Sequence, residues 1–107
     1  MDDNQPHQRQ LARAQQRERE EQRHLAHAGV AALLRDATRA PAVIAYALEQ
    51  VAKWERGRLC SRDYIEQWHA LLAGSPEAIA DLLEARSPLA ERLRQNTPFA
   101  SYLRLPM

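Results

Sequence analysis

Apolar side chains recur at three- and four-residue spacings through most of the chain, which is the period of an α-helix. Two apolar stripes are the strongest, one ending at Trp54 and the other beginning at Tyr64. Because only the short segment 57–60 separates them, we predict an antiparallel hairpin of two helices, residues 41–56 and 61–73, whose stripes face each other. The predicted core anchors are Leu48, Val51, Trp54, Ile65, Trp68 and Leu72.

Further helix starts are marked by pairs of a hydroxyl residue and a proline. Such a pair puts a hydroxyl at the N-cap and proline at the first helical position, where its missing N–H group costs nothing. Three of these pairs occur: Ser75-Pro76, Ser87-Pro88 and Thr97-Pro98. They predict short helices over 76–85 and 88–95 and a third helix start at Pro98. No alternating Val, Ile and Thr stretch indicates a strand. The predicted fold class is therefore all-α, a small bundle of four to five helices with a long, charged N-terminal helix.

The N-terminal segment has the composition of a helix that projects into water. Residues 8–23 contain one leucine and two alanines as their only apolar side chains, and the rest are the helix formers Arg, Glu and Gln. Apolar spacing resumes at Leu25, so we expect the later part of this helix to dock on the core or on its copy in a dimer. We divide the chain into residues 1–36, a charged helix whose first few residues are disordered, and residues 37–107, a compact helical domain.

One face of the N-terminal helix is basic. At 100° per residue, five arginines fall within about 160° of one another, with Glu20 intruding among them. They are Arg9, Arg13, Arg17, Arg19 and Arg23. In one interpretation this is a solvated, charge-mixed helix in which Arg17 and Glu21 pair, a contact that contributes about 0.2–0.5 kcal/mol. In the other, the arginines contact phosphates or an acidic protein surface, because the guanidinium fork matches both geometries.

The C-terminus is unusually apolar for a chain end. Four large side chains lie in its last ten residues: Phe99, Tyr102, Leu103 and Leu105. Chain ends are normally polar and frayed, so this segment has a specific use. It either covers the open end of the bundle or forms a docking segment for another protein.

A DNA-binding helix-turn-helix is the obvious regulatory hypothesis for residues 62–85. The helix that would read DNA carries Glu77, Asp81 and Glu84, and a phosphate-lined groove repels such an acidic helix. We therefore interpret these three acids as a solvated face.

Signatures of catalysis and metal binding are lacking. The single cysteine, Cys60, excludes an internal disulfide and a zinc quartet. His24 and His27 are read as an exposed pair, because no third ligand is suitably spaced. The three glycines form no phosphate-binding loop. We expect a protein that is not an enzyme and that uses no cofactor, no metal and no small-molecule substrate.

Composition narrows the class of protein further. A core built from about 70 residues is marginal for a monomer, so a protein partner or a homo-oligomer is expected. The net charge of +1 gives no global attraction to nucleic acid, so any such contact must be local. No run of 18 apolar residues occurs, which predicts a cytoplasmic protein without a membrane partner. Fourteen arginines against one lysine are typical of a GC-rich bacterial genome.

These observations predict a small bacterial regulatory or accessory protein that acts by protein–protein interaction. Adaptors, inhibitors and antitoxins, which are frequent on mobile elements, belong to this class. One alternative is a nucleic-acid-binding regulator that contacts phosphates through the arginine-rich helix. Another is a helical protein that assembles with itself into a structural oligomer.

Overall fold

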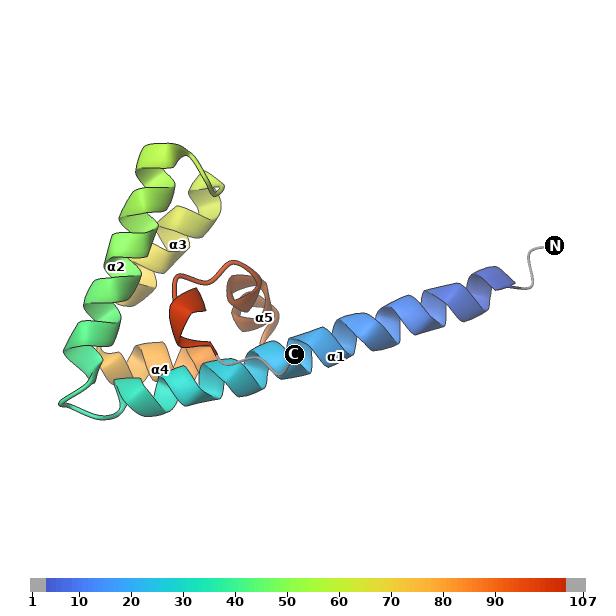
Figure 1. Cartoon of the computed structure of the whole chain (residues 1–107), viewed down its shortest axis with the longest axis horizontal. Helices are drawn as coiled ribbons and strands as arrows, with labels where there is room; N and C mark the ends of the chain where they lie inside the picture. The colour runs from blue at the N-terminus through green and yellow to red at the C-terminus, as the bar shows by residue number, and fades with distance from the viewer. Residues whose placement is uncertain (1–3, 104–107) are drawn as a thin grey trace.

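The computed structural model describes residues 4–103 of the chain, with side chains from His7 onward, and the described part consists of helices joined by short loops, without strands (Figure 1). Its elements are α1 (Asn4–Leu34), α2 (Ala40–Gly57), α3 (Arg62–Leu72), α4 (Pro76–Glu84), α5 (Pro88–Gln95) and the 3₁₀ turn η1 (Ala100–Tyr102). The predicted all-α bundle with a long N-terminal helix is confirmed. The disorder predicted for the first few residues concerns mainly residues 1–3, which lie outside the described range.

The helices form a body from which one end of α1 projects (Figure 1). The C-terminal half of α1 packs mainly against α4, while α2 and α3 form the predicted hairpin beside them. The N-terminal half of α1 leaves the body, which gives the molecule extents of 57 × 29 × 25 Å. Within residues 4–103, no helix combines the length and the apolar surface needed to cross a membrane.

Two of the three predicted hydroxyl–proline starts open α-helices. The Ser75 hydroxyl accepts a hydrogen bond from the Ala78 N–H group at 3.1 Å, and Ser87 does the same for Ala90 at 3.1 Å. These contacts satisfy N–H groups that the first turn of a helix leaves without partners. The third pair, at Thr97, leads only to the 3₁₀ turn η1.

The core lies where the hairpin meets α1, α4 and α5. Of the predicted anchors, Val51, Ile65, Trp68 and Leu72 are buried, and Trp54 is partly buried against the same cluster. The Trp68 indole N–H also donates to the carbonyl of Asn96 at 2.8 Å.

The prediction that Leu48 anchors the core is wrong, since 40 % of this residue is exposed. The buried stripe of α2 runs through Val43, Ala47 and Val51. Leu48 follows Ala47 directly, so it lies about 100° around the helix from that stripe. The small Ala47 side chain occupies the inward position.

The core also includes the end of α1. Val30, Ala31 and Leu34 are buried in the same cluster as the hairpin residues. The docking of the later part of this helix on the core is therefore observed. The N-terminal helix and the helical domain share one core across residue 36.

Candidate functional site

A single stripe of side chains on α1 changes character along the helix. Its members recur at alternating spacings of four and three residues: Arg9, Arg13, Gln16, Glu20, Arg23, His27, Val30 and Leu34. The last three are buried, Glu20 and Arg23 are partly buried, and the first three are exposed. The face that docks on the body therefore continues, uncovered and polar, from Gln16 back to Arg9. We call residues 4–19 the arm.

A buried ion pair fixes the point where the arm leaves the body. The Arg94 side chain is only 2 % exposed, and its Nε and Nη2 atoms donate to one carboxylate oxygen of Glu20 at 2.9 and 2.7 Å. Its Nη1 atom donates to the carbonyls of Leu83 and Ala85 at 3.1 and 2.7 Å. A buried charge is tolerated only when it is paired in this way. Arg94 therefore joins α5 to α1 and to the C-terminal end of α4.

Glu21 also forms an ion pair with a residue of the body. Arg86, in the loop between α4 and α5, forms an ion pair with it. The hydrogen bond from Arg86 lowers the pKa of the Glu21 carboxyl below its ordinary value. No Arg17–Glu21 pair forms among the described residues, so the mutual neutralisation expected within the helix is absent.

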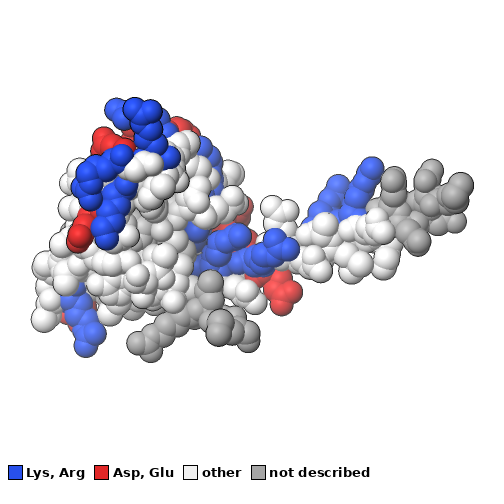
Figure 2. All heavy atoms as spheres, turned by 45° about the horizontal axis from the view of Figure 1, so that its top comes forward, with Lys and Arg blue, Asp and Glu red and all other residues white. Residues whose placement is uncertain are grey.

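The arm is strongly basic. Glu20 and Glu21, which follow it, do not neutralise its arginines because they pair with Arg94 and Arg86 of the body. The arm carries four arginines and one acid, Glu18, which sums to a net charge of +3 with histidine neutral. Its arginines are Arg9, Arg13, Arg17 and Arg19, all exposed. Within residues 4–103 none of these four forms an ion pair. Basic side chains lie along the projecting helix in Figure 2.

Arg23, the fifth arginine of the predicted basic face, has a different role. It is partly buried and pairs with Glu20 at 3.4 Å, so it belongs to the junction with the body. Of the five arginines of the predicted basic face, four therefore lie on the arm and the fifth lies where α1 meets the body.

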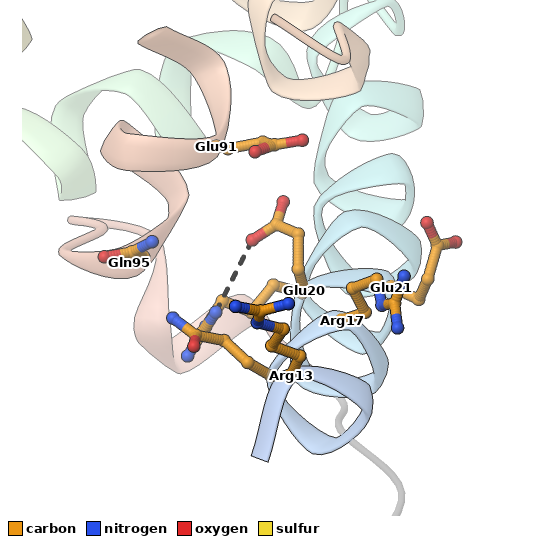
Figure 3. Close-up of a pocket in the computed structure, with 8 residues that line it drawn as sticks. Arg13, Arg17, Glu20, Glu21, Glu91 and Gln95 are labelled. Atoms are coloured by element: carbon orange, nitrogen blue, oxygen red, sulfur yellow. Dashed lines mark hydrogen bonds and ion pairs between the residues drawn. The ribbon is translucent and has the colours of Figure 1, made fainter. Parts of the chain in front are cut away.

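The arm and α5 enclose an open groove of about 600 Å³ (Figure 3). Its residues from α1 are Arg13, Gln16, Arg17, Glu20, Glu21 and Arg23, and its residues from α5 are Glu91 and Gln95. The α1 wall thus carries three guanidinium groups beside two carboxylates that are paired with Arg94 and Arg86, whereas the α5 wall presents a carboxylate and an amide. A ligand of mixed charge matches these two walls better than a purely anionic one.

His27 is buried, so the prediction of an exposed histidine pair is wrong for this residue. Its Nδ1 atom lies 2.7 Å from the Arg23 carbonyl, which can only accept, so Nδ1 carries the proton. The Nε2 atom then accepts from the Thr97 hydroxyl at 2.9 Å. Thr97 in turn accepts from the Phe99 N–H group at 3.1 Å. Burial lowers the pKa of His27, and the neutral ring is a structural link between α1 and the chain end.

The three acids of α4 are more than a solvated face. Although exposed to different degrees, all three contact Arg35, which directly follows α1. The Arg35 guanidinium lies 3.4 Å from Glu77 and 2.8 Å from Asp81, and it also pairs with Glu84. Hydrogen bonds to Glu84 and Asp81 raise the pKa of Arg35. An arginine of the α1 segment therefore already binds an acidic helix in this molecule.

The apolar C-terminal segment covers the core as far as it is described. Phe99 is fully buried and meets Trp68 edge to face, with ring centroids 5.8 Å apart. Tyr102 and Leu103 are partly buried against the core, and Leu105 lies outside the described residues. Docking through Tyr102, Leu103 and Leu105 stays a prediction, whereas Phe99 is inside the core and is not accessible to a partner. Its contacts are those of a lid.

Other candidate chemistry is sparse in residues 4–103. Cys60 is a partly buried free thiol, and no cluster of three or more His, Cys, Asp or Glu side chains could hold a metal ion. Comparison with protein families, with curated proteins and with solved structures found no match to this chain.

Proposed function

We propose that this is a small accessory or regulatory protein that acts by binding another protein, and that the arm is its main binding element. The segregation of charge along α1 carries this proposal. The body engages Glu20 and Glu21 through Arg94 and Arg86, whereas the arm keeps a net charge of +3. Unpaired guanidinium groups on a projecting helix are suited to carboxylates of a partner.

The charge of the body favours a protein partner over nucleic acid. Residues 20–103 contain ten basic and eleven acidic side chains, which gives a net charge of −1. A polyphosphate in the groove would meet Glu91 on α5 and gain no attraction from the body as a whole. A protein surface carries both signs of charge, so it can place carboxylates against the arginines of α1 and a basic group against Glu91 of α5. Adaptors, inhibitors and antitoxins work through such contacts, and the excess of arginine over lysine supports a bacterial host, in which we propose a cytoplasmic location.

Nucleic-acid binding is the second candidate, because four exposed arginines on one short helix segment also suit phosphates. The two candidates differ in their response to salt. Phosphate binding releases counterions. The logarithm of the binding constant would therefore fall steeply and linearly with the logarithm of the salt concentration. A protein interface built on pairs between these arginines and carboxylates is also screened by salt but loses less, because a protein partner has no condensed counterions to release.

Capture from cells that express the protein naturally tests this proposal, with each extract divided into nuclease-treated and untreated halves. The arm variant replaces Arg9, Arg13, Arg17 and Arg19 by Gln. The control variant makes the same charge change on the body by replacing Arg39, Lys53, Arg56 and Arg58, all exposed. We expect a stoichiometric protein that survives nuclease, is retained by the control variant and is lost by the arm variant. Capture that disappears with nuclease would support the nucleic-acid candidate.

A discrete oligomer without another component, unchanged in the arm variant, would instead support self-assembly. The opposite face of α1 offers a surface for that outcome, since Leu11 and Leu25 are 50 % and 69 % exposed.

A further inference from the structure

We propose that the arm binds an acidic α-helix of the partner, whose carboxylates recur every four residues and meet Arg9, Arg13 and Arg17. This inference rests on the proposed function and specifies the chemistry and shape of the segment that is bound. The partner helix enters the groove between the arm and α5 at Arg13 and Arg17 and extends beyond the groove to Arg9.

The first observation is that the face of α1 that packs on the body continues along the helix beyond the residues that the body covers. The stripe that is buried at His27, Val30 and Leu34 continues without a break through Gln16 to Arg9. In Figure 1 α4 lies along the C-terminal half of α1, while the arm extends beyond the body. A helix seated on the arm would use the same face of α1 that the body already uses.

The second observation is the spacing of the arginines. Arg9, Arg13 and Arg17 are four residues apart, which places them about 6 Å apart along the helix axis. Carboxylates at i, i+4 and i+8 of another helix have the same spacing, because both helices have the same rise per residue. Two such ridges packed together cross at about 50°, a common angle for helix pairs. Three pairs can therefore form at one crossing.

The third observation is an example within the molecule. The acids of α4 that contact Arg35 lie at spacings of four and three residues: Glu77, Asp81 and Glu84. Beside the apolar contacts between α1 and α4, a single guanidinium group thus pairs with three acids on one face of a helix. The arm carries the same type of donor on the helix that Arg35 follows, and within residues 7–103 none of its arginines forms an ion pair.

The far wall of the groove fixes which way the partner helix faces. Glu91 and Gln95 lie on α5, opposite Arg13 and Arg17 (Figure 3). A bound helix therefore needs its acidic ridge toward the arm and a basic or polar residue toward Glu91. Nucleic acid has no cationic group to offer at that position.

Two synthetic peptides test this inference on the full chain by NMR titration at low salt. Both are alanine-rich helices of identical composition with three glutamates, either on one i, i+4, i+8 ridge or distributed around the helix. We expect the ridge peptide to bind about fivefold to tenfold more tightly, as the sum of three exposed pairs. Its binding should shift the side-chain signals of Arg9, Arg13 and Arg17.

Arg19 supplies the matched control, because it lies about 120° around the helix from Arg13 and does not line the groove. Arg13→Gln should reduce the preference for the ridge peptide to about threefold to fivefold, because two of the three pairs remain, whereas Arg19→Gln, with the same change of charge, should keep it in full. Circular dichroism checks that both variants stay helical.

Equal affinity for the two peptides, or equal effects of Arg13→Gln and Arg19→Gln, would overturn the inference, because charge without spacing would then suffice. The proposed function would survive that result, since it is tested separately by capture from cells and fails if the arm variant still captures its partner or if capture disappears with nuclease. A single-stranded oligonucleotide that displaces the ridge peptide at equal concentration would overturn the protein helix as the occupant. Self-association that competes with the peptide would assign the arm to a second copy.

Discussion

Arg94 is the side chain on which the position of the arm depends most. Replacing it by methionine keeps most of the side-chain length but removes all four of its hydrogen bonds, two to Glu20 and two to the carbonyls of Leu83 and Ala85. The Glu20 side chain is only 17 % exposed, so its carboxylate cannot recover full hydration while α1 stays docked. The variant leaves this partly buried carboxylate with only the longer ion pair to Arg23, at 3.4 Å.

The expected loss in the free energy of unfolding is about 3–5 kcal/mol, the usual cost of removing one partner from a buried ion pair. Small domains have a total stability of about 5–15 kcal/mol, so Arg94→Met should shift the denaturation midpoint strongly. Replacing both partners should cost less than the sum of the single changes, because the double variant leaves no buried charge.

Urea denaturation followed by far-UV circular dichroism and by tryptophan fluorescence measures these quantities. The series comprises Arg94→Met, Glu20→Gln and the double variant. Arg62→Met is the control, because the Arg62 side chain is 74 % exposed and pairs with Glu66 within α3, a contact that contributes about 0–1 kcal/mol. A loss below about 1 kcal/mol for Arg94→Met, or strictly additive losses, would refute the reasoning.

Three further predictions concern the core and the helix starts. Burial lowers the pKa of His27, so protonation favours the unfolded chain. The free energy of unfolding should be level above about pH 7 and fall as the pH drops below about 6.5, and His27→Gln should remove that slope in pH-dependent denaturation. Phe99→Ala should cost about 3–5 kcal/mol by urea denaturation, because it leaves a cavity against Trp68; a near-wild-type midpoint would contradict the lid. Ser75→Ala should cost about 1 kcal/mol through the lost N-cap, measured as a lower melting temperature, whereas a change at exposed Ser101 should leave the start of α4 intact.

The parts of the fold that were predictable are those encoded by neighbouring residues. Ser75 and Ser87 precede prolines, and each forms its cap bond within three residues. The hairpin followed from two apolar stripes and a short connection. Leu48 was misplaced because periodicity gives the width of an apolar face only roughly, and the small Ala47 takes the central position.

The junction of the site depended on contacts between distant segments. Arg94 lies 74 residues from Glu20, and the Thr97 hydroxyl lies 70 residues from His27. A local sequence pattern does not show which polar side chains will be paired across such distances. One signal was present, since Arg94 directly follows Leu93 and lies four residues after Ala90, both of them buried. The basic face itself was visible, but its division between arm and junction was set by Arg86 and Arg94.

The most direct test of the central claim is the affinity of the captured partner for the arm variant and the body variant, measured side by side at two salt concentrations. The arm variant replaces Arg9, Arg13, Arg17 and Arg19, and the body variant makes an equal change of charge. We predict that the arm variant binds at least about tenfold more weakly, while the body variant stays close to the unmodified chain. Equal affinities for the two variants would contradict the claim that the arm is the binding element.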